Sequence, residues 1–428
     1  MIRCWSLTLH DKMLDKRFIL VYASLNCYKE FDAKMKETLS YVIVTPHTVA
    51  KSRTGGVVSR LLSRTNLELV GTQMFAPDYT FVKKYADGLR IRSPQNQLML
   101  LADYMENVVA PSGGRPHRTL LLLFRGEKPC VQLLNACGHV HPQNVTVDAL
   151  LGETIRDTYA DMIFSKDNPD EIYYFEPAVL TPRSQPEADI DLKLFARFLE
   201  GKENIVRNII HPDPSKVEQS LVIIKPDNWN YGSGRPGSVM DMFSRTGLRL
   251  VGTKIFGFSL NQALNFYSSV EANLLENLAP VFGKKAKGVL EREFKIAING
   301  ETEKALSESF GREYAREQFY KIVEFMSGRR PDTCPPGDED KPGEVKCMII
   351  IYEGEDAIRK VRDVLGPTDP LKAPGGTIRR EFGSNVMINT AHASDSVENS
   401  LREQEIVKIN ENSLASIIKE YLDQSKNQ

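Results

Sequence analysis

The sequence predicts an α+β protein of two ferredoxin-like (βαββαβ) domains in tandem, with antiparallel sheets covered by helices. The stretch SRTNLELVGT (residues 63–72) returns as SRTGLRLVGT (residues 244–253) with eight of ten positions unchanged, which indicates an internal duplication. Short continuous apolar runs, typical of buried strands, occur at corresponding places in both halves. Each half is then ordered as β-α-β, further helices and β-α-β.

Each repeat opens with a buried strand and an amphipathic helix. The strands are YVIVT (residues 41–45) and LVIIK (residues 221–225). The apolar helical faces that follow are Val57, Val58, Leu61 and Leu62 in the first half, and Val239, Met242 and Phe243 in the second. We expect these helices to end at Asn66 and Gly247, because Asn and Gly best tolerate the left-handed conformation after a helix.

The remaining elements follow in the same order in both halves. LELV (residues 67–70) and LRLV (residues 248–251) alternate like strands with one charge facing solvent. LLLLF (residues 120–124) and CMIIIY (residues 347–352) are typical of buried strands. The next segment of the second half, residues 355–366, places Ile358, Val361 and Leu365 on one side of a helix.

These patterns divide the chain into four parts. Residues 1–38 form an N-terminal extension; the alternative is that the protein begins at Met13 or Met35. The first domain covers residues 39–180, and a Pro- and charge-containing linker with one helix covers residues 181–219. The second domain covers residues 220–428 and contains a charged, helical-looking insertion at about residues 270–315.

Composition narrows the functional class. The 428 residues carry 55 Lys and Arg against 56 Asp and Glu, which argues against bulk nucleic-acid binding. No apolar run approaches the roughly 18 residues that a membrane span needs. Six scattered cysteines without a CxxC motif favour a reducing, cytoplasmic location.

His392 is the main candidate for chemistry. It lies in NTAHASDSVE (residues 389–398) among small and polar residues. A neutral imidazole is a competent nucleophile near neutral pH without a separate base. By its residue type alone, a single histidine is more often an ordinary polar loop residue.

Five motifs in order resemble a nucleoside diphosphate kinase over roughly residues 220–406. They are IIKPD, GLRLVGTKIF, LGPTDP, GGTIRREF and NTAHASDSVE. The resemblance implies transfer of the γ-phosphate of a nucleoside triphosphate such as ATP to a nucleoside diphosphate, through a phosphohistidine at His392. It also implies ping-pong kinetics and a Mg²⁺ ion held by nucleotide phosphates and water rather than by dedicated protein ligands.

The resemblance also assigns roles to further residues. Lys225 matches a lysine that reaches the γ-phosphate. Ser394 and Glu403 match the pair that orients the histidine, although matching the dipeptide EI would select Glu405 instead of Glu403. The remaining nucleotide-binding matches are Tyr267, Arg362, Thr368, Arg379 and Asn389.

Some positions depart from the family pattern. Asn228 replaces a glycine, and the base-stacking phenylalanine falls on Gln318 by direct counting or on Phe319 after a one-residue slip. These departures favour the alternative of a non-catalytic nucleotide-binding regulatory or scaffold protein. In the first half, Cys137, His139 and His141 alternate as metal ligands on a strand would, but an ordinary strand edge can show the same pattern.

The first half lacks most of the charged set. Counting along the repeat places Thr45 opposite Lys225, and only Arg156 survives, opposite Arg379. The other pairs are Leu134 with Arg362, Val140 with Thr368, Lys166 with Asn389, and Pro169 with His392. We expect a first copy that keeps the fold without the chemistry. Because the family self-associates as dimers, trimers or hexamers, this copy would take a neighbouring subunit's place and make the chain a pseudo-dimer.

Overall fold

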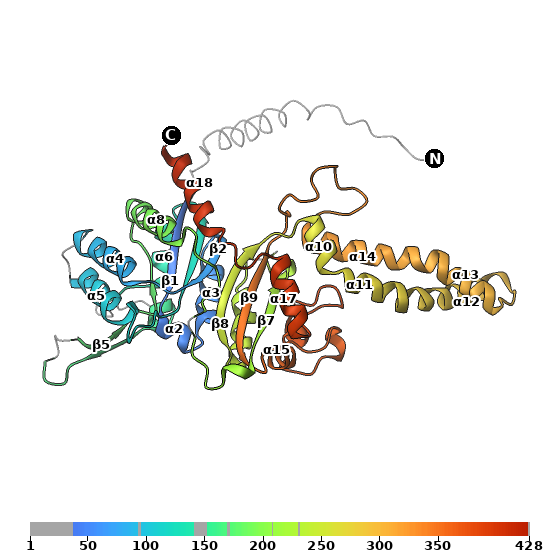
Figure 1. The fold of residues 1–428 in the computed structure, drawn as a ribbon, viewed down its shortest axis with the longest axis horizontal. Helices are drawn as coiled ribbons and strands as arrows, with labels where there is room; N and C mark the ends of the chain where they lie inside the picture. Colours follow the sequence, from blue (N-terminus) through green and yellow to red (C-terminus); the bar gives the residue numbers. More distant parts are fainter. Residues whose placement is uncertain are drawn as a thin grey trace, which may run out of the picture.

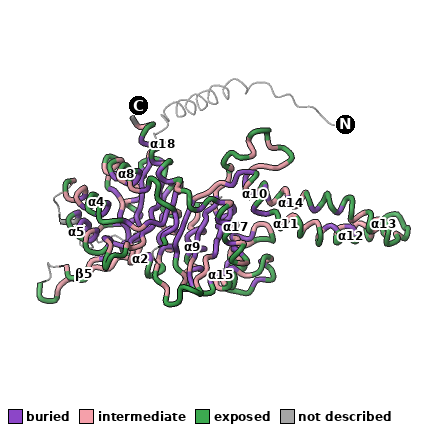
Figure 2. The backbone as a smooth tube through the Cα atoms, viewed as in Figure 1, coloured by how far each residue is buried: buried purple, intermediate pink, exposed green. Residues whose placement is uncertain are grey.

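A computed structural model describes residues 37–92, 96–140, 152–168, 172–207, 209–229 and 232–426. It is an α+β structure with two four-stranded antiparallel sheets, as the sequence predicts. Figure 1 shows the two sheets beside one another, with helices around them and a helical hairpin that projects from the second. The strands form the buried centre of the molecule (Figure 2).

The first sheet has the strand order β2-β3-β1-β6, and a small hairpin of β4 and β5 precedes β6. Its elements are β1 (Thr38–Val44), α2 (Pro46–Ala50), α3 (Thr54–Arg64), β2 (Glu68–Phe75), α4 (Tyr79–Arg92), α5 (Asn96–Tyr104), the π-helical η1 (Met105–Val109), β3 (Thr119–Gly126), α6 (Pro129–Cys137), α7 (Ile155–Tyr159), β4 (Asp161–Phe164), β5 (Ile172–Glu176), β6 (Val179–Leu180) and α8 (Gln185–Leu199).

The second sheet has the order β10-β7-β9-β8. Its elements are η3 (Pro214–Lys216), β7 (Val217–Ile224), η4 (Pro226–Asn228), α9 (Arg235–Phe243), η5 (Ser244–Thr246), β8 (Arg249–Phe256), α10 (Leu260–Phe266), α11 (Ser268–Asn273), η6 (Leu274–Leu278), α12 (Ala279–Phe294), α13 (Gly300–Leu306), η7 (Ser307–Gly311), α14 (Arg312–Ser327), β9 (Cys347–Glu355), α15 (Ala357–Leu365), η8 (Pro370–Lys372), α16 (Ile378–Phe382), β10 (Ala391–Ala393), α17 (Val397–Ile406) and α18 (Leu414–Lys426).

The two sheets match in order and in local irregularities. The order β6-β1-β3-β2 in the first sheet corresponds to the order β10-β7-β9-β8 in the second. Strands β2 and β8 carry a register shift at the corresponding position, Leu69/Gly71 and Leu250/Gly252. Left-handed residues also correspond: Lys128 and Asp356 precede equivalent helices, and Ala178 and Thr390 precede the last strands. The backbone of both halves is therefore built to one plan.

One expected helix end is wrong. Gly247 adopts the left-handed conformation with a φ of 69°, as predicted, but Asn66 is not among the positive-φ residues. Helix α3 ends instead at an extended Thr65, whose hydroxyl donates to the Leu61 carbonyl at 2.7 Å. A threonine side chain thus satisfies the carbonyl that a left-handed residue would otherwise cap.

Helices α3 and α9 join the two halves by direct contact. A Cβ atom added at Gly55 would lie 2.3 Å from the Asp241 nitrogen, and one at Gly237 would lie 2.1 Å from the Ser59 nitrogen. Only glycine allows the two backbones to approach so closely. The apolar residues of both helices and of both sheets form one continuous core, so the halves pack as a single body.

Two helices pack on the first half although the sequence placed them outside it. Helix α8, assigned to the linker, packs on β1, and α18, assigned to the second domain, packs on α8 and β2. Figure 1 shows α18 running back to the first sheet. Residues from the linker and from the C-terminal end therefore complete the core of the first half.

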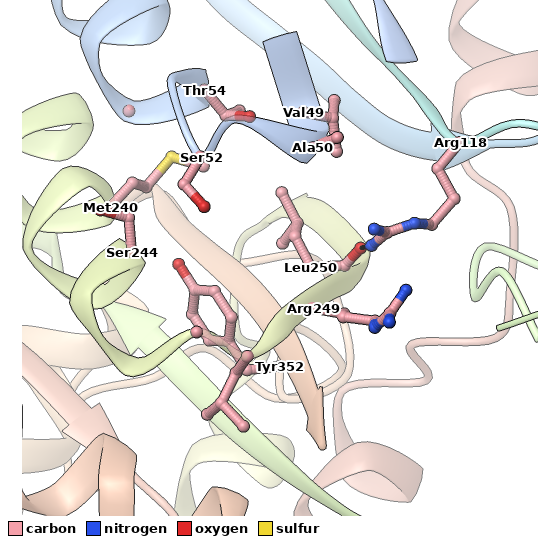
Figure 3. Close-up of a pocket in the computed structure, with 13 residues that line it drawn as sticks. Val49, Ala50, Ser52, Thr54, Arg118, Met240, Ser244, Arg249, Leu250 and Tyr352 are labelled. Carbon is pink, nitrogen blue, oxygen red and sulfur yellow. Dashed lines mark hydrogen bonds between the residues drawn. The ribbon is translucent and has the colours of Figure 1, made fainter. Parts of the chain in front are cut away.

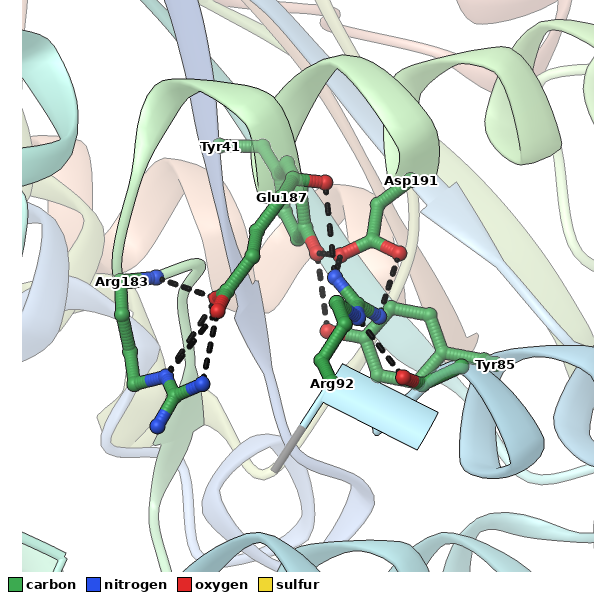
Figure 4. Close-up of polar contacts among 7 residues, drawn as sticks. Tyr41, Tyr85, Arg92, Arg183, Glu187 and Asp191 are labelled. Carbon is green, nitrogen blue, oxygen red and sulfur yellow. Dashed lines mark hydrogen bonds and ion pairs between the residues drawn. The ribbon is translucent and has the colours of Figure 1, made fainter. Parts of the chain in front are cut away.

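A buried polar network anchors α8 to the first sheet (Figure 4). Asp191 of α8 accepts hydrogen bonds from Tyr41 at 2.6 Å and from both terminal nitrogens of Arg92, at 2.8 and 2.9 Å. Tyr85 meets the Tyr41 hydroxyl at 2.9 Å. A nearly inaccessible carboxylate is thus paired with a cation and a hydroxyl, as burial of a charge requires.

The insertion after Tyr267 is helical, as expected, and it forms the long antiparallel hairpin of α11–α14 in Figure 1. Two further observations concern the helices and the cysteines of the described residues. Among the described helices, none combines the length and apolar character that crossing a bilayer requires. Of the cysteines in the described ranges, Cys130, Cys137, Cys334 and Cys347 carry free thiols.

We expect Asp191→Ala to lower the free energy of unfolding by about 3 kcal/mol, because it leaves the Arg92 guanidinium buried without its partner. Urea unfolding followed by circular dichroism measures this change. Glu187→Ala on the same helix is the control, since it removes a more exposed pair with Arg183 and should cost at most about 1 kcal/mol. Equal effects of the two substitutions would contradict an anchoring role for Asp191.

Candidate active site

His392 lies at the centre of β10, the short edge strand paired with β7. Its Nε2 is 2.9 Å from Oε1 of Glu403 on α17, and the Ser394 hydroxyl donates to the other carboxylate oxygen at 2.6 Å. Glu403 and Ser394 are buried, while the His392 side chain is 23% exposed. The geometry therefore selects Glu403 rather than Glu405, which is exposed, as the acid beside the histidine.

This contact defines which nitrogen of His392 is free. A carboxylate oxygen only accepts, so Nε2 carries the proton in the neutral imidazole and Nδ1 keeps its lone pair. No hydrogen bond engages Nδ1 within the described part of the chain. The Phe266 ring packs edge-on to the imidazole at 5.1 Å, and the Tyr267 ring lies 6.3 Å away. The ring is thus held on one side and open at Nδ1.

Lys225 follows the last residue of β7 and is 9% exposed. Its ammonium group donates to Oδ1 of Asn389 at 2.6 Å, and Asn389 in turn donates to the carbonyls of Val386 and Thr368. Burial, with a contribution from the Arg379 guanidinium, lowers the pKa of Lys225 to about 8. Asn389 therefore fixes the lysine from one side, and its own amide is fixed by the loop before β10.

Asn228 is a positioning residue that the motif comparison treated only as a departure. Its side-chain amide is fully buried and donates to the carbonyls of Lys225 at 3.0 Å and Thr390 at 2.8 Å. The Lys225 amide also donates to the Thr390 carbonyl at 3.0 Å. Two of these three bonds thus tie the end of β7 to the start of β10; the only sequence signal was an amide where a glycine was expected.

Arg379 holds backbone carbonyls in this structure. Its terminal nitrogens donate to Gly366 at 3.0 Å and Ala391 at 3.1 Å, which leaves Nε without a partner among the described residues. Burial and the neighbouring Arg362 lower the pKa of Arg379 to about 10. Arg362 itself lies exposed on α15. Arg379 therefore interacts electrostatically with Lys225 on one side and with Arg362 on the other.

Tyr267 and Thr368 lie at the margins of this cluster. Tyr267 is buried, its hydroxyl has no hydrogen-bond partner within the described ranges, and burial raises its pKa. Thr368 is exposed, and its carbonyl accepts from Asn389. The Tyr267 hydroxyl is therefore a buried donor without a partner among the described residues, on a ring that lies 6.3 Å from the His392 ring.

Phe319 does not fit the stacking role that was expected for it. Its side chain is 1% exposed and packs in the core of the second half with Val323 and Met326. A base could reach its face only if the residue left this core. Gln318, the other position obtained by counting, is half-buried on the same helix. Helix α14 therefore turns Phe319 toward the core. The local sequence could not show whether this side chain faces the core or the surface.

The donor sets do not form a dedicated metal cage. No group of three His, Cys, Asp or Glu side chains in the described residues is placed to hold a metal ion. Cys137 ends helix α6 rather than lying on a strand, and it is buried; His141 lies outside the described residues. The cations around His392 suit phosphate oxygens rather than a metal.

Comparisons with known proteins match the C-terminal part of the chain. The family model described as nucleoside diphosphate kinase matches residues 289–412. The nucleoside diphosphate kinase of Anaeromyxobacter sp. (strain Fw109-5) is 30% identical over 182 residues, 42% of this chain and 83% of the relative. That of Halorhodospira halophila (strain DSM 244 / SL1) is 29% identical over 189 residues, 44% of this chain and 91% of the relative.

A solved structure of an NDP kinase from Pyrobaculum aerophilum is 25% identical and covers 44% of this chain and 94% of its own, with a TM-score of 0.32. The sequence relatives are matched over most of their own length. Through its C-terminal part, the chain belongs to the nucleoside diphosphate kinase family.

We expect Lys225 to titrate near pH 8, well below the ordinary lysine value of 10.5. Since the unfolded chain then binds more protons between these two values, the contribution of Lys225 to the free energy of unfolding rises with pH across that window. NMR of ¹³C-labelled lysines measures the titration, and Lys225→Arg assigns the signal. Lys254→Arg is the matched control, because Lys254 also has a pKa lowered to about 8 by burial. A Lys225 titration near 10.5 would contradict the buried placement.

Proposed function

We propose that the chain is a nucleoside diphosphate kinase that transfers the γ-phosphate of ATP or another nucleoside triphosphate to a nucleoside diphosphate through His392. One observation carries the proposal. The His392 ring is fixed through Nε2 by a buried carboxylate, Nδ1 has no partner among the described residues, and the Arg379 guanidinium donates to the carbonyl of Ala391, the neighbour of His392 in β10. This is the arrangement that an imidazole nucleophile needs in order to accept a charged phosphoryl group.

The transfer balances as two displacements. Nδ1 attacks the γ-phosphorus, an N–P bond forms, and the bond to the bridging oxygen of the departing nucleoside diphosphate breaks. Glu403 accepts the Nε2 proton in a hydrogen bond and so stabilises the positive charge that develops on the ring. A nucleoside diphosphate oxygen then attacks the same phosphorus and regenerates the free imidazole. Ser394 keeps the carboxylate oriented throughout.

The cations have separate parts in this mechanism. Lys225, ionised below about pH 8, would stabilise charge on the transferred phosphate, and the exposed Arg362 is free to reach phosphate oxygens. Arg379 contributes its charge while its terminal nitrogens hold the backbone. Mg²⁺ would arrive with the nucleotide and neutralise phosphate charge. The unpartnered Tyr267 hydroxyl and the Thr368 side chain are further candidates for nucleotide contacts.

We further propose that the first half is a degenerate copy of the same ferredoxin-like domain. Its last strand pairs with β1 as β10 pairs with β7, so Leu180 corresponds to His392 and Pro177 to Asn389. The counted matches to Pro169 and Lys166 are therefore wrong, because the β4–β5 hairpin lies between Arg156 and the last strand. Pro169 itself lies outside the described residues. A leucine at this position cannot carry a phosphate.

The place of the lysine is also changed in the first half. Thr45 donates at 2.7 Å to Glu176, a carboxylate that is 1% exposed and also accepts from Tyr104 at 2.6 Å. A buried carboxylate at this point repels the phosphate that an ammonium group would attract. Arg156 survives for a structural reason: it donates to Gly138 and Val179, the counterparts of the carbonyls that Arg379 holds.

The contact between the halves supports a pseudo-dimer. Arg118 and Lys346 each precede the central strand of their own sheet. Arg118 donates to the Leu250 carbonyl at 2.6 Å, and Lys346 donates to the Leu69 carbonyl at 3.0 Å. Leu69 and Leu250 are the same position of the repeat, so the two bonds are related as in an isologous interface. Further self-association would then use other surfaces.

The decisive test is phosphorylation of His392. We expect γ-labelled ATP with Mg²⁺ to leave an acid-labile, base-stable label on the wild-type chain and none on His392→Ala. His211→Ala is a matched control. His211 lies away from this site and forms a similar pair with Glu353, with 2.8 Å between the histidine nitrogen and the carboxylate oxygen. Tight ATP binding without a label on any of these proteins would instead support a nucleotide-binding regulatory or scaffold protein.

We expect Glu403→Gln to slow labelling of His392 by about tenfold to a hundredfold, the effect of losing a charged hydrogen-bond partner. The substitution keeps the shape of the side chain, so ATP affinity should change little. Rapid-quench labelling measures the rate, and equilibrium titration measures the affinity. Glu405→Gln, two residues away and exposed, should leave both unchanged. A larger effect at Glu405 would transfer the orienting role to that residue.

A further inference from the structure

A cleft between the two halves is lined by paired arginines. It measures about 300 Å³ and opens beside a second hollow of about 540 Å³, and the guanidinium-bearing residues Arg118 and Arg249 line both. Figure 3 shows these two side chains together at one end, with Ser52, Thr54 and Tyr352 around the remaining space. Among the residues that the structure describes, no Asp or Glu side chain lines either hollow.

The two guanidinium groups lack a carboxylate partner. Arg118 is half-buried and donates to the Leu250 carbonyl, and Arg249 is exposed and forms no ion pair among the described residues. Burial, together with the charge of Arg249, lowers the pKa of Arg118 to about 10. Glu353 is the nearest opposing charge, but His211 and Gln219 already hold its two oxygens at 2.8 Å each.

The equivalent cleft on the opposite side of the pseudo-dimer is neutralised. There Lys346 takes the place of Arg118, and the residue at the position of Arg249 in the repeat is Glu68. The Lys346 ammonium and the Glu68 carboxylate form an ion pair at 2.5 Å. The same architecture therefore contains a satisfied pair in one cleft and two like charges in the other. Because like charges held together repel one another, an anion bound at the second cleft would stabilise it.

We propose that the cleft between Arg118 and Arg249 binds a small anion carrying two or more phosphate groups. Planar guanidinium groups suit bidentate contact with phosphate oxygens, and the hydroxyls of Ser52, Thr54 and Tyr352 add neutral donors. The volume limits the ligand to the size of a polyphosphate or a nucleotide. The site is separate from His392, which lies on the strand at the other edge of the second sheet.

Calorimetry with tripolyphosphate tests this proposal on the full-length chain. We expect Arg249→Glu to remove one binding event or weaken it at least tenfold, since the new carboxylate would pair with Arg118 as Glu68 pairs with Lys346. Glu68→Arg should create an additional event in the opposite cleft. Arg312→Glu, an equal change of charge at an exposed position on the helical hairpin, should have no effect. Any binding at the His392 site remains in all four proteins, so the difference isolates the cleft.

Arginine modification by phenylglyoxal locates the ligand. Tripolyphosphate should protect Arg118 and Arg249 from modification, as measured by peptide mass spectrometry, and should leave Arg312 reactive. Equal protection by ADP would identify a nucleotide as the ligand, and protection by tripolyphosphate alone would identify an inorganic polyphosphate. Unchanged calorimetry in Arg249→Glu together with no protection would overturn the proposal, as would binding of an acidic peptide but not of tripolyphosphate. Loss of His392 labelling would affect neither readout.

Discussion

The hydrogen bond from the Lys225 amide to the Thr390 carbonyl is the constraint on which the site depends. It joins Lys225, the first residue after the buried central strand β7, to Thr390, the last residue before the short edge strand β10. From this point the register places Ala391 opposite Ile224 and His392 opposite Ile223, so the lysine and the histidine are fixed relative to one another by main-chain pairing. Side chains then refine the position: the Asn228 amide adds one further bond across the junction, to the Thr390 carbonyl, and one to the Lys225 carbonyl on its own side.

The same backbone junction exists in the first half. In the first half, the Thr45 amide donates to the Ala178 carbonyl at 3.1 Å, and Ala178 has a φ of 60° against 74° for Thr390. A left-handed residue other than glycine at a functional site is often interpreted as strain stored for function. Its occurrence in both halves indicates instead that the strand entry requires it. The arginines at 156 and 379 belong to the same scaffold, which explains why one of them outlasted the rest of the charged set.

The sequence was informative where periodicity and repetition determine structure. The strands, the amphipathic helices and the duplicated order are set by local apolar patterns, and Glu403 could be chosen by counting because α17 follows β10 without an insertion. Counting failed between Arg156 and Leu180, because a hairpin adds residues that no motif marks. It also could not show that Phe319 faces the core or that α18 returns to the first half, since both depend on tertiary packing rather than on local sequence.

Two similar halves within one chain can differ at their contact in a way that two identical subunits cannot. In a symmetric dimer of identical subunits, the two clefts beside a two-fold axis have the same residues, because each substitution appears in both. Here the repeat carries Glu68 on one side and Arg249 on the other, so one cleft holds a neutralising ion pair and the other holds two positive charges. Neither charge is needed for the close contact of α3 and α9, which depends on glycines and apolar residues. The rims of the contact can therefore differ between the halves while its centre holds them together. Both clefts have room for a small ligand, and it is the pair of arginines without a carboxylate that distinguishes the cleft at Arg118 and Arg249.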